Sequence, residues 1–197
     1  MLHCTMTRMP LPIPGRPTRD LPPPQPGDYP AQLEGVFENA QEKLIIRPIR
    51  PSDEEAHADF FAHQTPDDIR FRFFSALKQI PPKLMFRLTH IDYVTEMAFI
   101  AVRPTTGETL GVARLVRDGL SDDGEFAVAI RPDVKSHGLA YHLMQKLFDW
   151  GRSQNMTHVH ALILSDNGPM IAFVRKLGCR LRRDPQDASV VIAEMSL

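Results

Sequence analysis

A change of periodicity over residues 125–140 constrains the fold more than any other part of the sequence. Apolar residues alternate as in a strand up to Ile130, and Pro132 and Asp133 end that strand. From Gly138 onward, apolar residues recur at helical spacing. A strand, a tight loop and a helix start form a natural anion site, because the N–H groups and the dipole of the first helical turn favour negative charge. Gly138 has no Cβ, so a phosphate can approach the backbone there.

The rest of the chain predicts an α+β fold, that is, an α/β mixed sheet with helices on both faces. Strands are expected over residues 44–49, 96–103, 109–117, 124–131, 158–164, 178–183 and 189–195, and helices over 52–63, 66–76, 81–90, 138–153 and 169–177. The strand at 158–164 is expected to lie parallel to the strand at 124–131, because a helix connects them. In the helix at 66–76, Phe71, Phe73 and Phe74 are expected to pack inward while Arg70 and Arg72 face out.

The N-terminal region differs in composition from the rest of the chain. Nine of the 18 prolines lie in residues 1–30. Proline removes backbone donors and fixes φ, so this stretch cannot form a packed layer by itself. We therefore expect residues 1–43 to be a proline-rich, disordered arm, with residues 31–43 covering an edge of a folded domain over 44–197. A linker and a docking segment for a proline-binding partner are both consistent with the arm.

Charge and composition exclude several classes of function. The formal net charge of −1 gives no reason to expect binding to nucleic acid or to an anionic membrane surface. The two cysteines, Cys4 and Cys179, do not suggest a disulfide framework, and no secretory signal or membrane-spanning run is recognisable, so a cytoplasmic location is expected. His158 and His160 face one side of a strand without further ligands nearby in sequence, so no metal site is predicted.

The loop between the predicted strand and the helix that begins at Gly138 also has a recognisable residue spacing. Residues 135–140, Lys-Ser-His-Gly-Leu-Ala, resemble the pyrophosphate loop of the Gcn5-related N-acetyltransferases (GNAT), usually written Gln/Arg-x-x-Gly-x-Gly/Ala. Gly138 and Ala140 agree with that pattern, and Lys135 stands where Gln or Arg is usual. The predicted order of strands and helices also matches the GNAT fold.

Further motifs resemble one branch of that superfamily, the protein lysine acetyltransferases of the Pat type. They cover about residues 45–185 and are Arg47-Pro-Ile-Arg-Pro-Ser-Asp53, Arg70-Phe-Arg-Phe-Phe-Ser75, Leu88-Thr-His-Ile-Asp-Tyr93, Gly111-Val-Ala-Arg114, Glu125-Phe-Ala-Val128 and Arg175-Lys-Leu-Gly178. The resemblance implies transfer of an acetyl group from acetyl-CoA to the ε-amine of a lysine in a protein, with an acyl-CoA synthetase as the suggested acceptor. The synthetase-like region that often accompanies such domains is absent from this chain.

The resemblance assigns the role of general base to Glu125. A lysine ε-amine has a pKa of roughly 10.4, so a base must take a proton before or during its attack. The residues alone favour a different interpretation, in which Glu125 is a surface acid beside the acidic turn of Asp122 and Asp123. The Tyr that serves as general acid in many GNAT enzymes is replaced by Val174.

The resemblance also suggests which residues bind the cosubstrate. Backbone groups of Val128, Ala129 and Ile130 would pair with the pantetheine arm as an added strand would. The diphosphate would be held by the loop of Lys135, Ser136, His137, Gly138, Leu139 and Ala140. Asn167 would either donate a hydrogen bond to the CoA arm or cap the following helix.

Three hypotheses follow from the sequence. The first is an acetyl-CoA-dependent lysine acetyltransferase that acts on proteins by direct attack of the amine. The second is an enzyme of the same chemistry whose acceptor is a small amine or an N-terminus. The third is a non-catalytic acyl-CoA-binding regulatory module, suggested by the change at Lys135 and the missing synthetase region.

Overall fold

The computed structural model describes residues 28–134 and 138–197. The elements follow one another as η1 (Ala31–Leu33), β1 (Gly35–Glu38), β2 (Lys43–Pro48), η2 (Pro51–Asp53), α1 (Glu54–Ala62), α2 (Pro66–Phe73), α3 (Pro82–Thr89), β3 (Glu96–Val102), β4 (Thr109–Arg117), β5 (Asp123–Ile130), α4 (Leu139–Ser153), β6 (His158–Leu164), α5 (Gly168–Lys176), β7 (Arg180–Arg183) and β8 (Val190–Ser196). Most of the predicted boundaries lie within a few residues of these.

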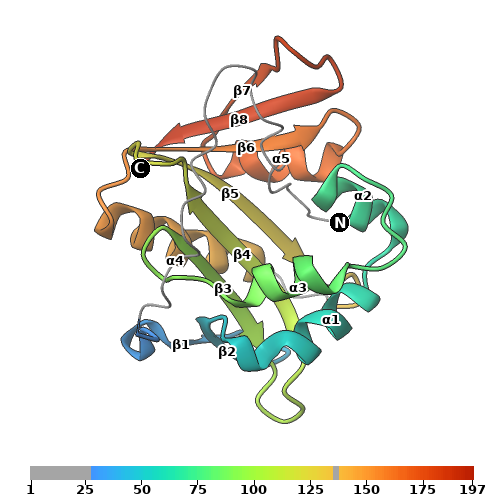
Figure 1. The fold of residues 1–197 in the computed structure, drawn as a ribbon, viewed down its shortest axis with the longest axis vertical. Coiled ribbons are helices and arrows are strands. Elements are labelled where there is room, and N and C mark those ends of the chain that lie inside the picture. Colours follow the sequence, from blue (N-terminus) through green and yellow to red (C-terminus); the bar gives the residue numbers. More distant parts are fainter. Residues whose placement is uncertain (1–27, 135–137) are drawn as a thin grey trace.

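The eight strands of the described residues belong to one sheet, in the order β1-β2-β3-β4-β5-β6-β8-β7 (Figure 1). Neighbours are antiparallel except for β5 and β6, which are parallel. The helix α4 makes the crossover that a parallel pair requires. The predicted α+β architecture, a mixed sheet with helices on both faces, is therefore confirmed.

Two buried clusters lie on opposite faces of the sheet, because side chains alternate along each strand. On β3, Phe99 packs with residues of α4, whereas its neighbour Ile100 packs with residues of α1, α2 and α3. We call these the α4 face and the α1–α3 face. The cluster on the α4 face also includes Met170 and Val174 of α5. Figure 1 shows α3 in front of the central strands and α4 behind them.

The sheet extends further toward the N-terminus than expected. Residues 35–38 form β1, which pairs antiparallel with β2 from Gly35 opposite Ile46 onward. Phe37 packs against the core on the α4 face and lies 5.3 Å from the His142 ring, measured between centroids. Four residues are too few to be recognised as a strand from sequence, and the edge of β2 supplies their pairing. Residues 1–27, which hold most of the expected proline-rich arm, lie outside the described residues.

The prediction for α2 was wrong in its orientation. The helix ends at Phe73, and Phe74 adopts a left-handed conformation with φ of 52°. Arg72 is buried, whereas the phenylalanines on either side of it are only half-buried. Asp68 and Ile69 lie four and three residues before Arg72, so the three residues share the inward face. Arg70 faces out as expected.

Candidate active site

The parallel strands β5 and β6 separate part of the way along their length. Within these two described strands, pairing covers only residues 123–125 of β5 and 158–160 of β6, and it ends where Glu125 lies opposite His160. Beyond that point β5 stays paired with β4 as far as Ile130, and β6 stays paired with β8 as far as Leu164. Figure 1 shows the two strands diverging from this apex. We call the space between them the β5–β6 opening; an extended ligand inserted there could pair with a strand edge.

Val128, Ala129 and Ile130 form the part of β5 that runs beside this opening. Val128 and Ala129 are buried, and Ile130 is half-buried. The Ala129 side chain packs on the α1–α3 face, whereas Val128 and Ile130 pack on the α4 face. Because these side chains are used by the core, what this segment can offer a ligand is its backbone.

Glu125 is at the apex of the opening. Its side chain is buried, with 8% of the residue's surface exposed, and it lies between Val116 of β4 and His160 of β6 in register. Since alternate residues share a face, Glu125 lies on the α1–α3 face with Ala127 and Ala129. A carboxyl group is thus placed where the two strands begin to part.

His160 is closer to this apex than sequence reasoning suggested. The pair His158 and His160 was interpreted as one solvated strand face, but the side chain of His160 is only 30% exposed against 63% for His158. The His160 Nδ1 lies 3.6 Å from the Asp118 Oδ2. Burial raises the pKa of Asp118, and His160 opposes that effect. His160 therefore lies opposite Glu125 in register and also faces the carboxyl group of Asp118.

The predicted anion site lies at the start of α4, and anion binding there stays a prediction. Gly138 precedes the helix with φ of 97°, a conformation that other residues adopt only with strain. No described side chain caps this helix. Leu139 and Ala140 are buried in the core, so their contribution to a ligand would come from backbone N–H groups. Lys135, Ser136 and His137 lie outside the described residues.

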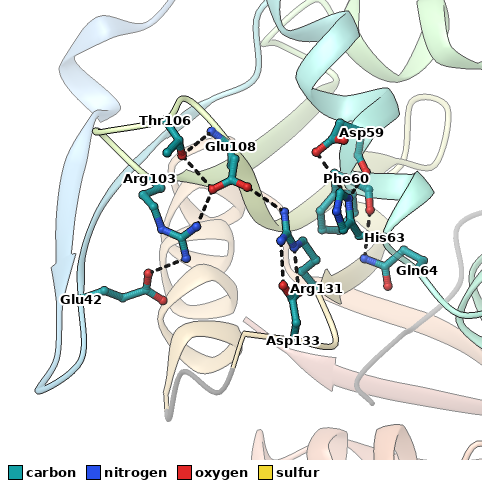
Figure 2. A network of polar contacts seen from close by, with 10 residues as sticks. All are labelled: Glu42, Asp59, Phe60, His63, Gln64, Arg103, Thr106, Glu108, Arg131 and Asp133. Atoms are coloured by element: carbon teal, nitrogen blue, oxygen red, sulfur yellow. Dashed lines mark hydrogen bonds and ion pairs between the residues drawn. The ribbon is translucent and has the colours of Figure 1, made fainter.

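Between β5 and α4, a network of charged residues holds the chain (Figure 2). Arg131, which directly follows β5, donates from Nε and Nη2 to the two carboxylate oxygens of Asp133, each over 2.7 Å. Its Nη1 donates to Glu108 over 3.3 Å, and Glu108 also accepts from Arg103. Arg103 reaches Glu42 over 3.2 Å. The hydrogen bonds from Arg131 lower the pKa of Asp133.

Sequence reasoning did not identify Arg131, although the spacing Arg-Pro-Asp was visible. Its buried guanidinium ties the end of β5 both to the start of the loop and to the turn between β3 and β4. A bidentate arginine–carboxylate pair fixes geometry as well as charge. The backbone of residues 131–133 is therefore held both by the Arg131–Asp133 pair and by the link to the turn between β3 and β4.

Asn167 follows β6 and begins α5. It is buried, and its Oδ1 accepts a hydrogen bond from the Met170 N–H over 3.2 Å, so the capping role is present. A contact between Asn167 and CoA stays a prediction. Val174, in the position where many GNAT enzymes have a Tyr, is buried in the core.

Three further properties of the described residues concern metal ligands, membrane-spanning helices and cavities. Within residues 28–134 and 138–197, no group of three or more His, Cys, Asp or Glu side chains could hold a metal ion. In the same part of the chain, none of the helices is both long and apolar enough to cross a bilayer. A cavity of about 750 Å³ lies among α1, α2 and α3, lined by Phe61, Ile69 and Met85 among others, and not between β5 and β6.

Comparison with known proteins identifies the family. The sequence profile of the Acetyltransferase (GNAT) domain matches residues 43–180. A Pseudomonas aeruginosa protein named Acetyltransferase PA5475 is 31% identical over 156 residues, which are 78% of this chain and 84% of that protein. Acetyltransferase Pat from Mycolicibacterium smegmatis is 24% identical over 79% of this chain, which spans about half (46%) of that longer protein.

Solved structures share the fold. The GNAT domain of PAT from S. lividans superimposes with a TM-score of 0.80 at 24% identity, covering 86% of this chain and 100% of that domain. A cAMP-binding acyltransferase from Mycobacterium smegmatis gives a TM-score of 0.57 at 20% identity over 84% of this chain and 48% of its own. GNAT enzymes use acyl-CoA as cosubstrate. The chain therefore belongs to the GNAT family of N-acetyltransferases.

Proposed function

We propose that this protein transfers the acetyl group of acetyl-CoA to lysine ε-amines of acceptor proteins, with Glu125 as general base. The observation that carries the proposal is the position of Glu125 at the apex of the β5–β6 opening. A thioester arm lying in the opening would end beside that carboxyl group.

The donor would be bound mainly through the backbone. The pantetheine amides would pair with the edge of β5 at Val128, Ala129 and Ile130, as an added strand does. The diphosphate would lie at the N-terminus of α4, against the N–H groups that follow Gly138 and the loop of residues 135–137. Arg131 would hold residues 131–133, at the end of β5, through Asp133 and Glu108. Asn167 would contact the arm from the β6 side.

The chemistry requires one proton to leave the acceptor. The neutral lysine nitrogen attacks the thioester carbonyl carbon and forms the C–N bond, and the carboxylate of Glu125 accepts a proton from that nitrogen directly or through water. The tetrahedral intermediate then collapses, the C–S bond breaks, and CoA leaves as a thiolate or as a thiol protonated by water. Because Val174 is apolar and buried, it cannot supply that proton.

The acceptor we propose is a lysine side chain of another protein. Similarity to Acetyltransferase Pat and to the PAT domain favours a lysine in a protein, and an acyl-CoA synthetase is the acceptor class we propose. A cytoplasmic location fits such a partner and stays a prediction.

The proposal is tested by incubating the protein with acetyl-CoA and a panel of acyl-CoA synthetases, with small amines as competing acceptors. We expect a mass increase of one acetyl group on a synthetase lysine. Glu125→Gln should abolish most of this signal, whereas Asp123→Asn, an exposed carboxylate two residues earlier on the same face of β5, should leave it intact. Acetylation of small amines alone would favour the second hypothesis, and acetyl-CoA binding without turnover would favour the third.

A further inference from the structure

One ion pair joins parts of the molecule that are far apart in sequence. The Arg70 Nη2 on α2 donates to the Asp166 Oδ2 over 2.7 Å, across 96 residues. The Arg70 Nε also lies 3.6 Å from the Asp67 Oδ1, one turn back on the helix. The arginine is therefore held by a carboxylate of its own helix while it reaches toward the other half of the sheet.

The position of this pair relates it to the proposed acceptor side of the site. Asp166 lies two residues beyond Leu164, at the end of β6 that is farthest from the apex at Glu125 and His160. Figure 1 shows α2 beside α5, on the side toward which β5 and β6 diverge. The pair therefore joins α2 to the β6–α5 turn on the open side of the β5–β6 opening.

The turn that carries Asp166 is also anchored to its own half of the protein. The Ser165 N–H donates to the Ser189 carbonyl over 2.8 Å, and the Asn167 N–H donates to the Leu164 carbonyl over 2.9 Å. Asp166 is thus presented by a turn with a defined shape, and the contact with Arg70 determines how far α2 lies from that turn.

Both partners remain in contact with solvent. The side chain of Arg70 is 35% exposed and that of Asp166 is 60% exposed. An ion pair with this exposure contributes little to folding stability and is screened by salt. It can break and form again without unfolding its surroundings, so its loss should affect the geometry of the opening more than the stability of the fold.

We infer that Arg70 and Asp166 are positioning residues for the acceptor amine, because together they set the separation of α2 and the β6–α5 turn. This inference rests on the proposed function, in which the acceptor enters from the open side toward Glu125. A preset separation means that less ordering is needed when the acceptor binds. The donor is proposed to bind mainly at β5 and α4. The backbone hydrogen bonds of Ser165 and Asn167 hold the β6–α5 turn without Arg70, so donor binding should depend little on the pair.

The test compares Arg70→Ala, Asp166→Ala and the charge exchange Arg70→Asp with Asp166→Arg. Each single variant should raise the KM for the acceptor by about two- to fivefold, the range of an exposed ion pair. The KM for acetyl-CoA, kcat at saturating acceptor and the melting temperature should stay close to wild type. The exchanged pair should recover part of the loss, because an Asp at position 70 regains the contact with position 166 but lies beside the like charge of Asp67. Arg182→Ala, which removes another exposed ion pair with Glu194, serves as the matched control and should change none of these values.

A readout that needs no acceptor separates this inference from the proposed function. Hydrogen–deuterium exchange of α2 amides should be faster in both single variants than in wild type, with β3 and β4 unchanged. If the wild-type protein acetylates no acceptor, the proposed function fails, and the exchange result still decides whether the pair holds α2. An unchanged acceptor KM, an unchanged exchange rate in α2, or no recovery in the exchanged pair would overturn the inference.

Discussion

On the β5 side of the opening, Arg131 is buried and binds two carboxylates. On the β6 side, Arg70 is more exposed and lies between Asp67 of its own helix and Asp166 in the turn after the strand. The Arg131 side chain is 8% exposed and makes two hydrogen bonds to Asp133 and one to Glu108. The side chains of Arg70 and Asp166 are 35% and 60% exposed. The first contact fixes the chain in one geometry, and the second can be broken at small cost.

This difference follows the chemistry that each side is proposed to serve. The donor carries the same diphosphate and pantetheine in every reaction cycle, so a preset binding surface lowers the ordering needed for binding. Acceptor lysines lie on protein surfaces of different shape. A contact between α2 and the β6–α5 turn that can break and form again would let the acceptor side adjust to them. Four substitutions test this comparison. They are at Glu125 at the apex, Arg131 at the end of β5, His57 on α1 and Gly138 before α4.

The largest effect is expected at the apex, where both sides meet. Glu125→Gln keeps the size of the side chain but removes its basicity, so kcat should fall by about 10²- to 10⁴-fold, the range of general base catalysis. The KM for acetyl-CoA should change little, because the donor is held by backbone groups. Steady-state kinetics with both substrates varied gives the two values. A loss confined to the KM for acetyl-CoA would mean that Glu125 supports donor binding and is not the base.

On the fixed side, Arg131→Ala should weaken both the fold and the binding of the donor. Hydrogen bonds to charged groups contribute about 1.5–3 kcal/mol, and we expect a loss near the lower end because Asp133 is largely exposed. The KM for acetyl-CoA should rise by about tenfold while kcat is kept. Urea unfolding and initial rates measure these changes, with Arg182→Ala as the matched control. Equal effects of the two substitutions would show that the β5 side is no more tightly held than the surface.

The buried His57 on α1 should make the folding stability depend on pH. The ring stacks against Phe60, and burial lowers its pKa to about 3, with Arg72 and Arg114 adding to the effect. The unfolded state takes up a proton below the usual pKa near 6.5, whereas the folded state does not. Stability is therefore fully present above pH 6.5 and is lost as the pH falls, by about 2 kcal/mol at pH 5.

The substitution His57→Leu isolates this contribution from those of other titrating groups. The difference in unfolding free energy between wild type and His57→Leu should shift by about 2 kcal/mol in favour of the variant between pH 7 and pH 5. Among the described residues the Nδ1 atom of His57 is buried without a hydrogen-bond partner, so the substitution removes no hydrogen bond at that atom. If the unfolding free energies of the two proteins changed equally with pH, the pKa of His57 would not be lowered by burial on α1.

The smallest effect is expected at the start of α4. The Cβ added by Gly138→Ala meets no atom of the described residues within 4 Å, so its cost comes from the positive φ of 97° and should be about 1 kcal/mol. Gly178, with φ of 96° and similar free space, is the matched control after α5. Both substitutions should lower stability equally in urea unfolding. Only Gly138→Ala should weaken acetyl-CoA binding in calorimetry, and equal binding would remove Gly138 from the donor site.

Sequence patterns predicted the parts of this protein that depend on neighbours along the chain. The strand, loop and helix around Gly138 and the parallel placement of the strand that begins at His158 followed from periodicity and connection length. Arg72 was misplaced because the aromatic residues around it suggested a different inward face, and only packing against the sheet decides which face is buried. Arg131 and Arg70 were not identified as structural links, since their partners Glu108 and Asp166 lie 23 and 96 residues away.

The β5–β6 opening as the binding site for acyl-CoA is tested most directly by a crystal structure of the protein with acetyl-CoA. We predict that the pantetheine arm lies between residues 126–130 of β5 and residues 161–164 of β6, with the thioester beside the Glu125 carboxyl group and the diphosphate at Gly138. Acetyl-CoA bound instead in the cavity among α1, α2 and α3, or a Glu125 side chain turned away from the thioester, would contradict this account.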